Sequence, residues 1–291
     1  MIRALALSPS LDITHEVDSL TRGGITRPTR SVRVAGGKTL NAARVAHSLG
    51  ARVHVFAALG GPTGQWITDS LAAEGIPVTT TTLHEPTRTC IAIVETARQS
   101  PVSTDLYEPA ATLAPNEWTA FRTAVQAARG DGGWATLSGS IPAGVPLDEL
   151  GQLLAALRSA GSKIALDSSG DGLRTLVGLA DVVKINLQEA TELLEETPGD
   201  AAHACRLLRD RYRVDAVVTD GIRGAAALVG EEEHDVPGPR QLGRFPAGSG
   251  DAFLGGLITG LDRGDGLVAA LTLAADVGQR NALVAGQGRL A

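Results

Sequence analysis

The stretch 134–167 reads WATLSGSIPAGVPLDELGQLLAALRSAGSKIALD, with two apolar runs separated by an amphipathic segment. The runs Trp134–Ser140 and Lys163–Asp167 have the length and composition of buried strands. Between them, Leu147–Ala160 repeats leucine at helical spacing and ends at Gly161, a residue type that commonly terminates helices. A strand, a helix and a second strand in this order predict two parallel strands joined by a crossing helix.

The same alternation continues in both directions from this unit. It is typical of an α/β domain in which helices cover both faces of a mainly parallel sheet, and the 291 residues suit a single domain, 1–291. Further strands are expected at Ile2–Leu7, Val53–Leu59, Asp181–Ile185, Val214–Thr219 and Ala225–Val229. Further helices are expected at Thr39–Leu49, Gly64–Glu74, Pro115–Arg129, Leu187–Glu196, Ala201–Arg211, Gly250–Leu261 and Gly266–Ala285.

Two stretches, at about 14–34 and 87–107, break this alternation because neither contains a helical pattern. The second predicts two strands, Cys90–Glu95 and Val102–Tyr107, joined by a polar turn. We expect antiparallel strands that project from the α/β body as a lid over a cleft; the alternative is a pair of surface hairpins. Exposed strand edges often pair between subunits, so the lid also predicts a homodimer.

Composition excludes several classes of protein. The net charge is −6 and no basic block is present, which argues against nucleic acid or an anionic membrane as a partner. Cys90 and Cys205 are far apart and are expected to be reduced, buried thiols, and the six histidines form no short-spaced metal motif. The chain shows neither a signal peptide nor an apolar run of transmembrane length, so we expect a cytoplasmic protein.

The segment Gly248-Ser249-Gly250-Asp251 precedes an apolar helix. Small residues at a helix N-terminus allow backbone amides to point at an anion, and the helix dipole favours negative charge there. Asp251 is then either an ordinary acid of a first helical turn or a general base beside an anion hole. The local sequence by itself favours the ordinary interpretation.

The segment Gly36-Gly37-Lys38-Thr39-Leu40-Asn41 also precedes a predicted helix. A phosphate-binding P-loop needs a glycine at position 32, where this chain has Val32, so we reject that motif. The Gly-Gly turn remains a place where a substrate can approach the backbone, with Lys38 and Asn41 as polar contacts. The alternative is a helix-entry turn with a solvated lysine.

Polar and glycine-rich residues follow four successive predicted strands, and in open α/β sheets ligands bind at the carboxyl ends of the strands. One edge of the sheet is therefore predicted to be lined for a polar ligand. The four segments are Ser138–Pro146, Asp167–Gly170, Lys184–Glu189 and Thr219–Gly221.

These segments, in this order along essentially the whole chain, resemble the PfkB branch of the ribokinase-like carbohydrate kinases, and they look closest to 1-phosphofructokinase and tagatose-6-phosphate kinase. The matching segments are Ser8–Asp12 with N-P-x-L-D, Gly36–Arg44 with G-G-K-G-I-N-V-A-R, Thr87-Arg88 with T-R, Ser138–Pro146 with S-G-S-x-P-x-G-V-P, Lys184–Glu189 with K-x-N-x-x-E and Gly248–Asp251 with G-[AS]-G-D.

The resemblance implies a ribokinase-like fold and phosphoryl transfer from ATP, with Mg²⁺, to a hydroxyl of a sugar phosphate of the fructose 1-phosphate or tagatose 6-phosphate type. It implies that Asp251 is the general base and that the amides of Gly248, Ser249 and Gly250 form the anion hole. The residues implied on the acceptor side are Asp12, Gly37, Asn41 and Ser140 for the sugar and Arg88 and Lys38 for its phosphate. The residues implied on the nucleotide side are Lys184, Asn186, Thr219, Gly221 and Gly224, with Asn186 and Glu189 holding Mg²⁺ through water.

Departures from the family pattern concentrate on the acceptor side. Thr39 replaces a glycine of the sugar-side loop, and Tyr107 and Ala110 replace residues of an N-E-P-G segment. Asp105 stands where some relatives carry an arginine. These departures leave open a kinase of an unphosphorylated sugar or nucleoside, and a non-catalytic sugar-phosphate sensor is a further alternative. A dehydrogenase is disfavoured because no G-x-G-x-x-G follows the first strand.

Overall fold

The computed structural model describes residues 1–97, 102–128 and 132–291, and within them two sheets and two groups of helices. The larger sheet has nine strands in the order β13-β12-β11-β10-β9-β8-β1-β4-β5. All its pairs are parallel except those that β12 makes with β11 and β13. Its strands are β1 Ile2–Ala6, β4 Val53–Gly60, β5 Val78–Leu83, β8 Trp134–Ser138, β9 Lys163–Asp167, β10 Val182–Asn186, β11 Asp215–Thr219, β12 Ala225–Val229 and β13 Glu232–Val236.

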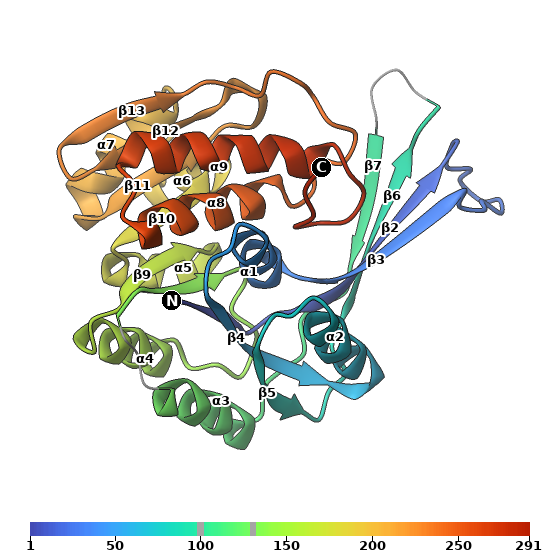
Figure 1. Ribbon diagram of the computed structural model, residues 1–291, viewed down its shortest axis with the longest axis horizontal. Coiled ribbons are helices and arrows are strands. Elements are labelled where there is room, and N and C mark those ends of the chain that lie inside the picture. The colour runs from blue at the N-terminus through green and yellow to red at the C-terminus, as the bar shows by residue number, and fades with distance from the viewer. Residues whose placement is uncertain (98–101, 129–131) are drawn as a thin grey trace.

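Helices cover both faces of this sheet, as the alternating pattern predicts (Figure 1). One face carries α3 Pro115–Ala127, α4 Leu147–Ser159, α5 Gly170–Leu176, α6 Leu187–Leu194 and α7 Ala201–Tyr212. The other face carries α1 Lys38–Ser48, α2 Gly61–Ala73, α8 Ser249–Arg263 and α9 Leu267–Ala282. Two short 3-10 helices, Val177–Leu179 and Gly221–Arg223, complete the helical segments of the described residues.

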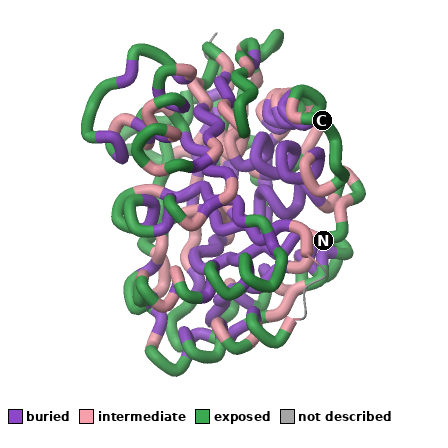
Figure 2. Tube along the Cα trace, turned by 90° about the vertical axis from the view of Figure 1, so that its left-hand side faces the viewer, coloured by how far each residue is buried: buried purple, intermediate pink, exposed green. Residues whose placement is uncertain are grey.

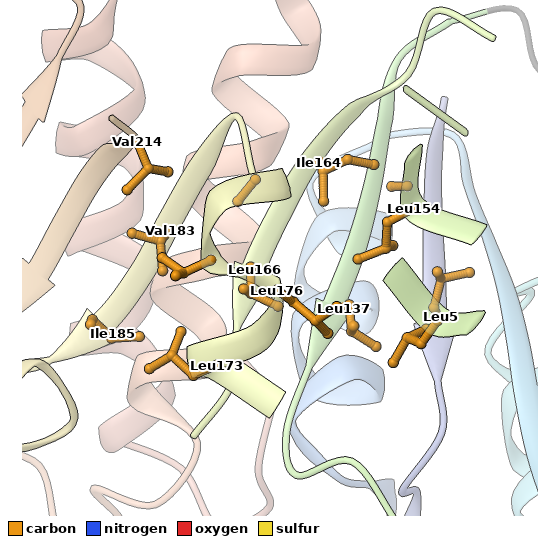
Figure 3. Close-up of a cluster of buried hydrophobic side chains, with 14 of the residues drawn as sticks. Leu5, Leu137, Leu154, Ile164, Leu166, Leu173, Leu176, Val183, Ile185 and Val214 are labelled. Atoms are coloured by element: carbon orange, nitrogen blue, oxygen red, sulfur yellow. The ribbon is translucent and has the colours of Figure 1, made fainter. Parts of the chain in front are cut away.

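Each helical layer has its own apolar core against the sheet. The residues of β1 show why: Ile2, Ala4 and Ala6 belong to one core and Leu5 to the other, because strand side chains alternate between faces. Figure 3 shows part of the first core, where Leu137 and Leu166 of the sheet meet side chains of the covering helices. Figure 2 shows that the buried segments run through the middle of the body, with exposed turns around them. Of the described helices, none has the combination of length and apolar character that spanning a bilayer requires.

The second sheet, here called the lid, has four strands in the order β3-β2-β6-β7 and projects from the α/β body (Figure 1). Its strands are β2 Ser10–Val17, β3 Arg30–Gly36, β6 Thr89–Glu95 and β7 Val102–Tyr107. The expectation of antiparallel strands is wrong for the central pair, since β2 runs parallel to β6. Both strands leave the same edge of the body, and that common origin makes them parallel.

Three elements do not have the sequence pattern of a buried element. The strand β5 has the sequence VTTTTL and lies at one edge of the large sheet, and β13, with the sequence EEHDV, lies at the other. Edge strands are solvated, so their composition is polar. The helix α5 spans only Gly170–Leu176, too short for a helical repeat to stand out.

The end of the predicted helix Pro115–Arg129 falls outside the described residues at Arg129.

Candidate active site

The four polar segments predicted after strands lie together, because β8, β9, β10 and β11 are adjacent in the sheet and parallel. The lid strands β2 and β3 and the N-terminus of α1 meet the sheet at the same edge, since Gly36 ends β3 and Lys38 begins α1. Contacts to Asp167 and Asp251 bring β9 and α8 to this position as well. The structure therefore gathers residues 8–12, 36–41, 138–140, 167, 184–189 and 248–251 at one edge.

Asp251 lies in the first turn of α8, which begins after Gly248 in a left-handed conformation, φ +83°. The carboxyl group is buried, and its Oδ2 accepts a hydrogen bond of 2.9 Å from the Asn41 Nδ2. Burial raises the pKa of Asp251 to about 7, and the nearby Asp167 carboxylate adds to the rise. The positive charges of Lys38 and Lys184 and the Asn41 hydrogen bond oppose that shift. Asp251 therefore titrates near neutrality, where a general base is most effective.

Two lysines share the fully buried carboxylate of Asp167. The Lys38 Nζ lies 2.9 Å from Asp167 Oδ1, and the Lys184 Nζ lies 2.7 Å from Asp167 Oδ2. Lys38 also pairs with Glu189 Oε1 at 3.1 Å. Burial alone would raise the pKa of Asp167, but the two ammonium groups hold it below the usual range. Burial alone would lower the pKa of Lys38, but the carboxylates of Asp167 and Glu189 raise it overall, so this lysine stays charged.

The backbone around Gly248–Asp251 is braced from behind by the end of α9 and the loop after it. The buried Asn281 donates from Nδ2 to the Ala247 carbonyl at 3.0 Å and accepts from the Gly288 amide at 2.8 Å. A Cβ added at Gly248 would lie 2.9 Å from the Gln287 Cβ, and one at Gly250 would lie 3.0 Å from the Lys184 Nζ. Gly248, with its left-handed φ, favours glycine, whereas a Cβ at Gly250 would have to displace the Lys184 ammonium group, which borders the loop directly.

The amides of this loop are not all equivalent. The Ser249 amide donates to the Pro246 carbonyl at 3.2 Å, so it has a partner within the protein. Gly250 and Asp251 belong to the first turn of α8, where a helix has no carbonyl of its own for its amides. Together with the cationic Lys184, these amides can bind the oxygens of an anion.

Asp12 lies at the base of the lid, opposite the Gly36-Gly37 turn. Its Oδ1 accepts from the Ser10 hydroxyl at 2.5 Å, and its Oδ2 accepts from the Gly37 amide at 3.4 Å. A Cβ at Gly36 would lie 2.1 Å from this carboxyl group, so only glycine fits beside it. Burial raises the pKa of Asp12, against the opposing effects of Ser10, Gly37 and the positive charge of Arg88.

Arg88 precedes β6 and is half-buried. It donates to the Ser8 carbonyl at 3.1 Å and to the Glu108 carbonyl at 3.2 Å, while its Nε is buried without a hydrogen-bond partner in the described part of the chain. Its hydrogen-bond partners are uncharged carbonyl groups, and it also interacts electrostatically with the nearby Asp12 carboxyl, so an anion bound here would share the guanidinium with Asp12. Ser140 is exposed, two residues beyond the end of β8.

Asn186 and Glu189 form a capping box at the start of α6. The Asn186 Oδ1 accepts from the Glu189 amide at 2.8 Å, and the Glu189 Oε2 accepts from the Asn186 amide at 2.9 Å. Glu189 Oε1 meets Lys38, so both of its oxygens have protein partners. Within the described residues no three His, Cys, Asp or Glu side chains cluster as a metal cage. Magnesium that keeps much of its water and bridges phosphates needs only one or two carboxylates, and these donors fit that mode.

The end of β11 continues into a tight, exposed turn that contains Gly221 and Gly224. Thr219 ends β11, and its hydroxyl faces the Ile185 carbonyl at 3.5 Å. Gly224 has φ +98°, and a Cβ there would lie 2.1 Å from the Val236 carbonyl oxygen. Ile222 within this turn is 71% exposed, which leaves an apolar side chain available to a flat ligand.

The departures from the family pattern occupy two different environments. Thr39 is buried, and its hydroxyl bonds to backbone groups of the sheet. Tyr107 pairs with Cys90, which pairs with Asp12, so these three residues occupy one row on the same lid face. Asp105 lies two residues away on that face, and Ala110 follows the end of β7. Tyr107 and Asp105 therefore lie on the same lid face as Asp12.

Two residues of this site, Asn281 and Gln287, were not predicted. Asp167 was predicted to line this edge, within the segment Asp167–Gly170, but no role was assigned to it. Asn281 and Gln287 had no signal of their own. The Gln287 Oε1 lies 3.4 Å from the Asn41 Nδ2, a contact across 246 positions that no local pattern indicates.

Comparisons with known proteins show a family match and a shared fold. The model of the family described as "pfkB family carbohydrate kinase" matches residues 7–289. Phosphofructokinase-2 from Escherichia coli, in complex with substrates and products, is 26% identical, with a TM-score of 0.90 over 97% of this chain and 93% of that one. The same enzyme in complex with fructose-6-phosphate is 26% identical, with a TM-score of 0.88 over 97% of this chain and 93% of that one. A possible 1-phosphofructokinase from Thermotoga maritima, 16% identical, shares the fold with a TM-score of 0.88 over 100% and 94%.

Proposed function

The chain belongs to the pfkB family of carbohydrate kinases and is an ATP-dependent sugar kinase with a ribokinase-like fold, and on that premise we propose that it phosphorylates a hydroxyl of a sugar phosphate with Asp251 as the general base. The carrying observation is the buried Asp251, whose pKa is raised to about 7 beside a helix N-terminus and two lysines. Phosphoryl transfer requires this combination of alignment and charge stabilisation.

Asp251 takes the proton from the acceptor hydroxyl as the oxygen attacks the γ-phosphorus of ATP in line with the leaving group. The hydrogen bond from Asn41 keeps the carboxyl group oriented toward the acceptor side. Asn41 Oδ1 is buried without a hydrogen-bond partner among the described residues, which supports a role in accepting a hydrogen bond from a sugar hydroxyl.

Charge that spreads over the γ-phosphoryl oxygens is received by the amides of the Gly248–Gly250 loop and by Lys184. The Ser249 amide has to release the Pro246 carbonyl to take part, whereas the Gly250 amide is already available. The close approach of the Lys184 Nζ to Gly250 supports the lysine as a direct partner of the nucleotide phosphates.

The nucleotide is proposed to lie along the ends of β10 and β11, with Asn186, Thr219, Gly221 and Gly224 beside it. Mg²⁺, when bound with ATP, would neutralise charge on the phosphate oxygens, with Asn186 and Glu189 contacting it through water. Glu189 keeps Lys38 and the Asn186 amide as partners in this arrangement.

The acceptor sugar is proposed to bind between the lid and the body. Asp12, Gly37, Asn41 and Ser140 orient its hydroxyls, and Arg88 and Lys38 bind its phosphate. Escherichia coli phosphofructokinase-2, solved with fructose-6-phosphate, supports a phosphorylated acceptor. Closure of the lid over the sugar would exclude water and limit ATP hydrolysis.

A second candidate acceptor is an unphosphorylated sugar. The observation in its favour is that Lys38 already pairs with two carboxylates, which leaves Arg88 as the cation available to an acceptor phosphate. The carboxylate of Asp105, on the lid face proposed to contact the acceptor, would also repel a phosphate group on the acceptor.

A panel of acceptors tests both candidates. ATP consumption with Mg²⁺ should be measured against fructose 1-phosphate, tagatose 6-phosphate, fructose 6-phosphate, fructose and ribose, with Asp251→Asn as the control. We expect turnover with a sugar phosphate and a loss of roughly 10²–10⁴-fold in Asp251→Asn. Turnover confined to fructose or ribose would select the second candidate, and a fully active, folded Asp251→Asn would contradict the proposed base.

A homodimer through the lid strands is proposed as the assembly. Residues that alternate with Asp12, Cys90 and Tyr107 point to the opposite face, where Ile13, Ile91 and Leu106 form one row. Leu106 is 55% exposed, and an apolar row on a thin sheet gains stability by burial against a second copy.

A further inference from the structure

Thr39 occupies the first turn of α1, where its side chain points into the sheet and not toward the ligand edge. It is 3% exposed. Its hydroxyl lies 2.8 Å from the Ser138 carbonyl and 3.3 Å from the Leu5 carbonyl, and it accepts from the Ser138 amide at 3.2 Å. Leu5 and Ser138 lie near the carboxyl ends of the adjacent parallel strands β1 and β8. One hydroxyl thus joins α1 to two neighbouring strand ends.

The N-terminus of α1 lacks a capping side chain among the described residues. Its N-cap residue is Gly37, with φ +93°, and no side-chain hydrogen bond caps the helix. Ser, Thr, Asp or Asn at the N-cap usually supplies such a bond, and glycine cannot. The Thr39 hydroxyl therefore takes over the anchoring of this turn, by bonding to the sheet instead of to the helix itself.

The residues on either side of Thr39 each contact a different part of the site. The Gly37 amide donates to Asp12, Lys38 pairs with Asp167 and Glu189, and Asn41 donates to Asp251. The five consecutive residues 37–41 therefore connect the carboxyl group of Asp12 to that of Asp251. Any displacement of this turn changes the position of both.

We propose that Thr39 is a positioning residue for phosphoryl transfer: its buried hydroxyl fixes the first turn of α1 to the ends of β1 and β8, and so sets the acceptor sugar relative to Asp251. The inference rests on the proposed function, because the position of the acceptor has a consequence only if Asp251 accepts its proton. Thr39 itself touches neither substrate.

The hydroxyl, and not the size of the side chain, carries this role. Valine has the same shape but would leave the Ser138 amide and carbonyl without the partner that Thr39 gives them. The strand end and the helix turn would then separate to admit water or other partners. A displacement of about 1 Å in a reacting group can cost roughly 100-fold in rate.

The experiment compares Thr39→Val, which removes the hydroxyl, with Thr39→Ser, which keeps it. The matched control is Thr259→Val, because Thr259 is equally buried and its hydroxyl bonds to the Gly255 carbonyl within α8. The probe is fructose 1-phosphate, or whichever sugar of the five-member panel the wild-type protein turns over fastest. KM for that sugar, KM for ATP, kcat and the thermal midpoint are measured for each protein, and sugar binding is measured separately by calorimetry.

We expect Thr39→Val to lose about 10- to 100-fold in kcat/KM, with a raised KM for the sugar and a KM for ATP within about twofold of wild type. Thr39→Ser should restore the wild-type KM for the sugar. A purely structural role would lower the thermal midpoint and the active fraction without changing either KM, as expected for Thr259→Val.

The inference is overturned if Thr39→Val shows the same KM for the sugar as the Thr259→Val control. If Thr39→Val does not fold, Thr39→Ala is compared with Thr39→Ser. Equal KM values for the sugar in these two variants overturn the inference, whereas a raised KM in Thr39→Ala alone supports it. Failure of the proposed function is distinct, because the wild-type protein would then turn over none of the five sugars.

Discussion

Asp251 combines burial, which disfavours its charge, with two lysines and an amide that favour it. Burial dominates, and the pKa rises from 3.8 to about 7. A carboxyl group with that pKa is half ionised near neutral pH, so it can accept a proton from a hydroxyl without binding it permanently. The reaction and the stability of the fold should both respond to the titration of this one group, in ways that can be measured separately.

The first prediction concerns the pH dependence of the rate. Below a pH of about 7 Asp251 is protonated and cannot act as a base, so kcat/KM should fall about tenfold for each pH unit below that value. The profile should be measured from pH 5 to 9 for the wild-type protein and for Asp251→Asn. The variant should lose this acidic limb, and an unchanged limb in Asp251→Asn would assign the limb to another group.

The second prediction concerns stability. Because the folded-state pKa of Asp251 is raised, the folded protein holds a proton that the unfolded chain has lost between about pH 4 and 7. The contribution of this group to stability is therefore present below pH 4 and is lost as the pH rises through 7, at about 1.4 kcal/mol per pKa unit. Asp251→Asn should be more stable than the wild-type protein at pH 8 and not at pH 4, as measured by urea unfolding.

Arg88 carries the third prediction. Its guanidinium donates to two carbonyl groups and lies near the Asp12 carboxyl, and it supplies the positive charge proposed to bind the acceptor phosphate. Arg88→Ala should therefore raise the KM for a sugar phosphate about tenfold or more and leave the KM for ATP unchanged. Arg158→Ala is the control, because Arg158 lies in the last turn of α4 and pairs with Asp181 just before β10, at the opposite end of the strands. An unchanged KM in Arg88→Ala would favour the unphosphorylated acceptor.

At the scale of elements, the site depends on one buried carboxylate that joins α1 to β9 and β10. Asp167 ends β9 and binds Lys38 from α1 and Lys184 from β10. A buried ion pair is a weak source of net stability, but removal of one partner leaves an uncompensated charge. Asp167 therefore determines whether these elements can approach one another at the ligand edge.

The fourth prediction follows from this contact. Asp167→Asn should lower the free energy of unfolding by about 3–5 kcal/mol, as measured by urea unfolding at pH 7. The matched control is Asp276→Asn, which breaks an exposed pair with Arg280 and should change it by no more than about 1 kcal/mol. The acidic limb of the rate profile should also move to lower pH, because the Asp167 carboxylate helps to raise the pKa of Asp251. Equal stability of the two variants would contradict the buried-pair argument.

At the scale of the whole molecule, the candidate site lies where the lid meets the body. Acceptor binding and proton transfer are proposed to come together there. The inner lid face carries Asp12 and the body carries Asp251, and the acceptor is proposed to lie between them. The outer lid face is left with the apolar row Ile13, Ile91 and Leu106. A lid that must close over a substrate benefits from support on its outer face, and a second lid would provide it.

The fifth prediction tests that support. Leu106→Glu should convert a dimer to a monomer in analytical ultracentrifugation and raise the KM for the acceptor sugar, because a charge cannot be buried in an apolar row. Val268→Glu is the control, since Val268 is 56% exposed on α9, away from the lid. A wild-type protein that sediments as a monomer would contradict the proposed dimer.

Much of the arrangement could be predicted from local pattern. The alternation of strands and helices follows from the short repeat of apolar residues along the sequence. Strands such as Lys163–Asp167 and Val102–Tyr107 have the predicted bounds. The parallel order then places polar strand ends at one edge. Exposed or edge elements such as β5 and β13 were missed because solvation removes the apolar signal that marks a strand.

The sequence by itself determined the α/β class, the family and the edge of the sheet where the polar strand ends gather, because short periods and ordered motifs encode these features. Only the tertiary structure decided the partners: that Asp167 neutralises Lys38 and Lys184, that Thr39 turns into the sheet, and that β2 pairs with β6 in parallel. Each of these contacts joins residues far apart in the chain. Burial, which sets the pKa of Asp251, likewise arises only when α1, β9 and α8 close around it.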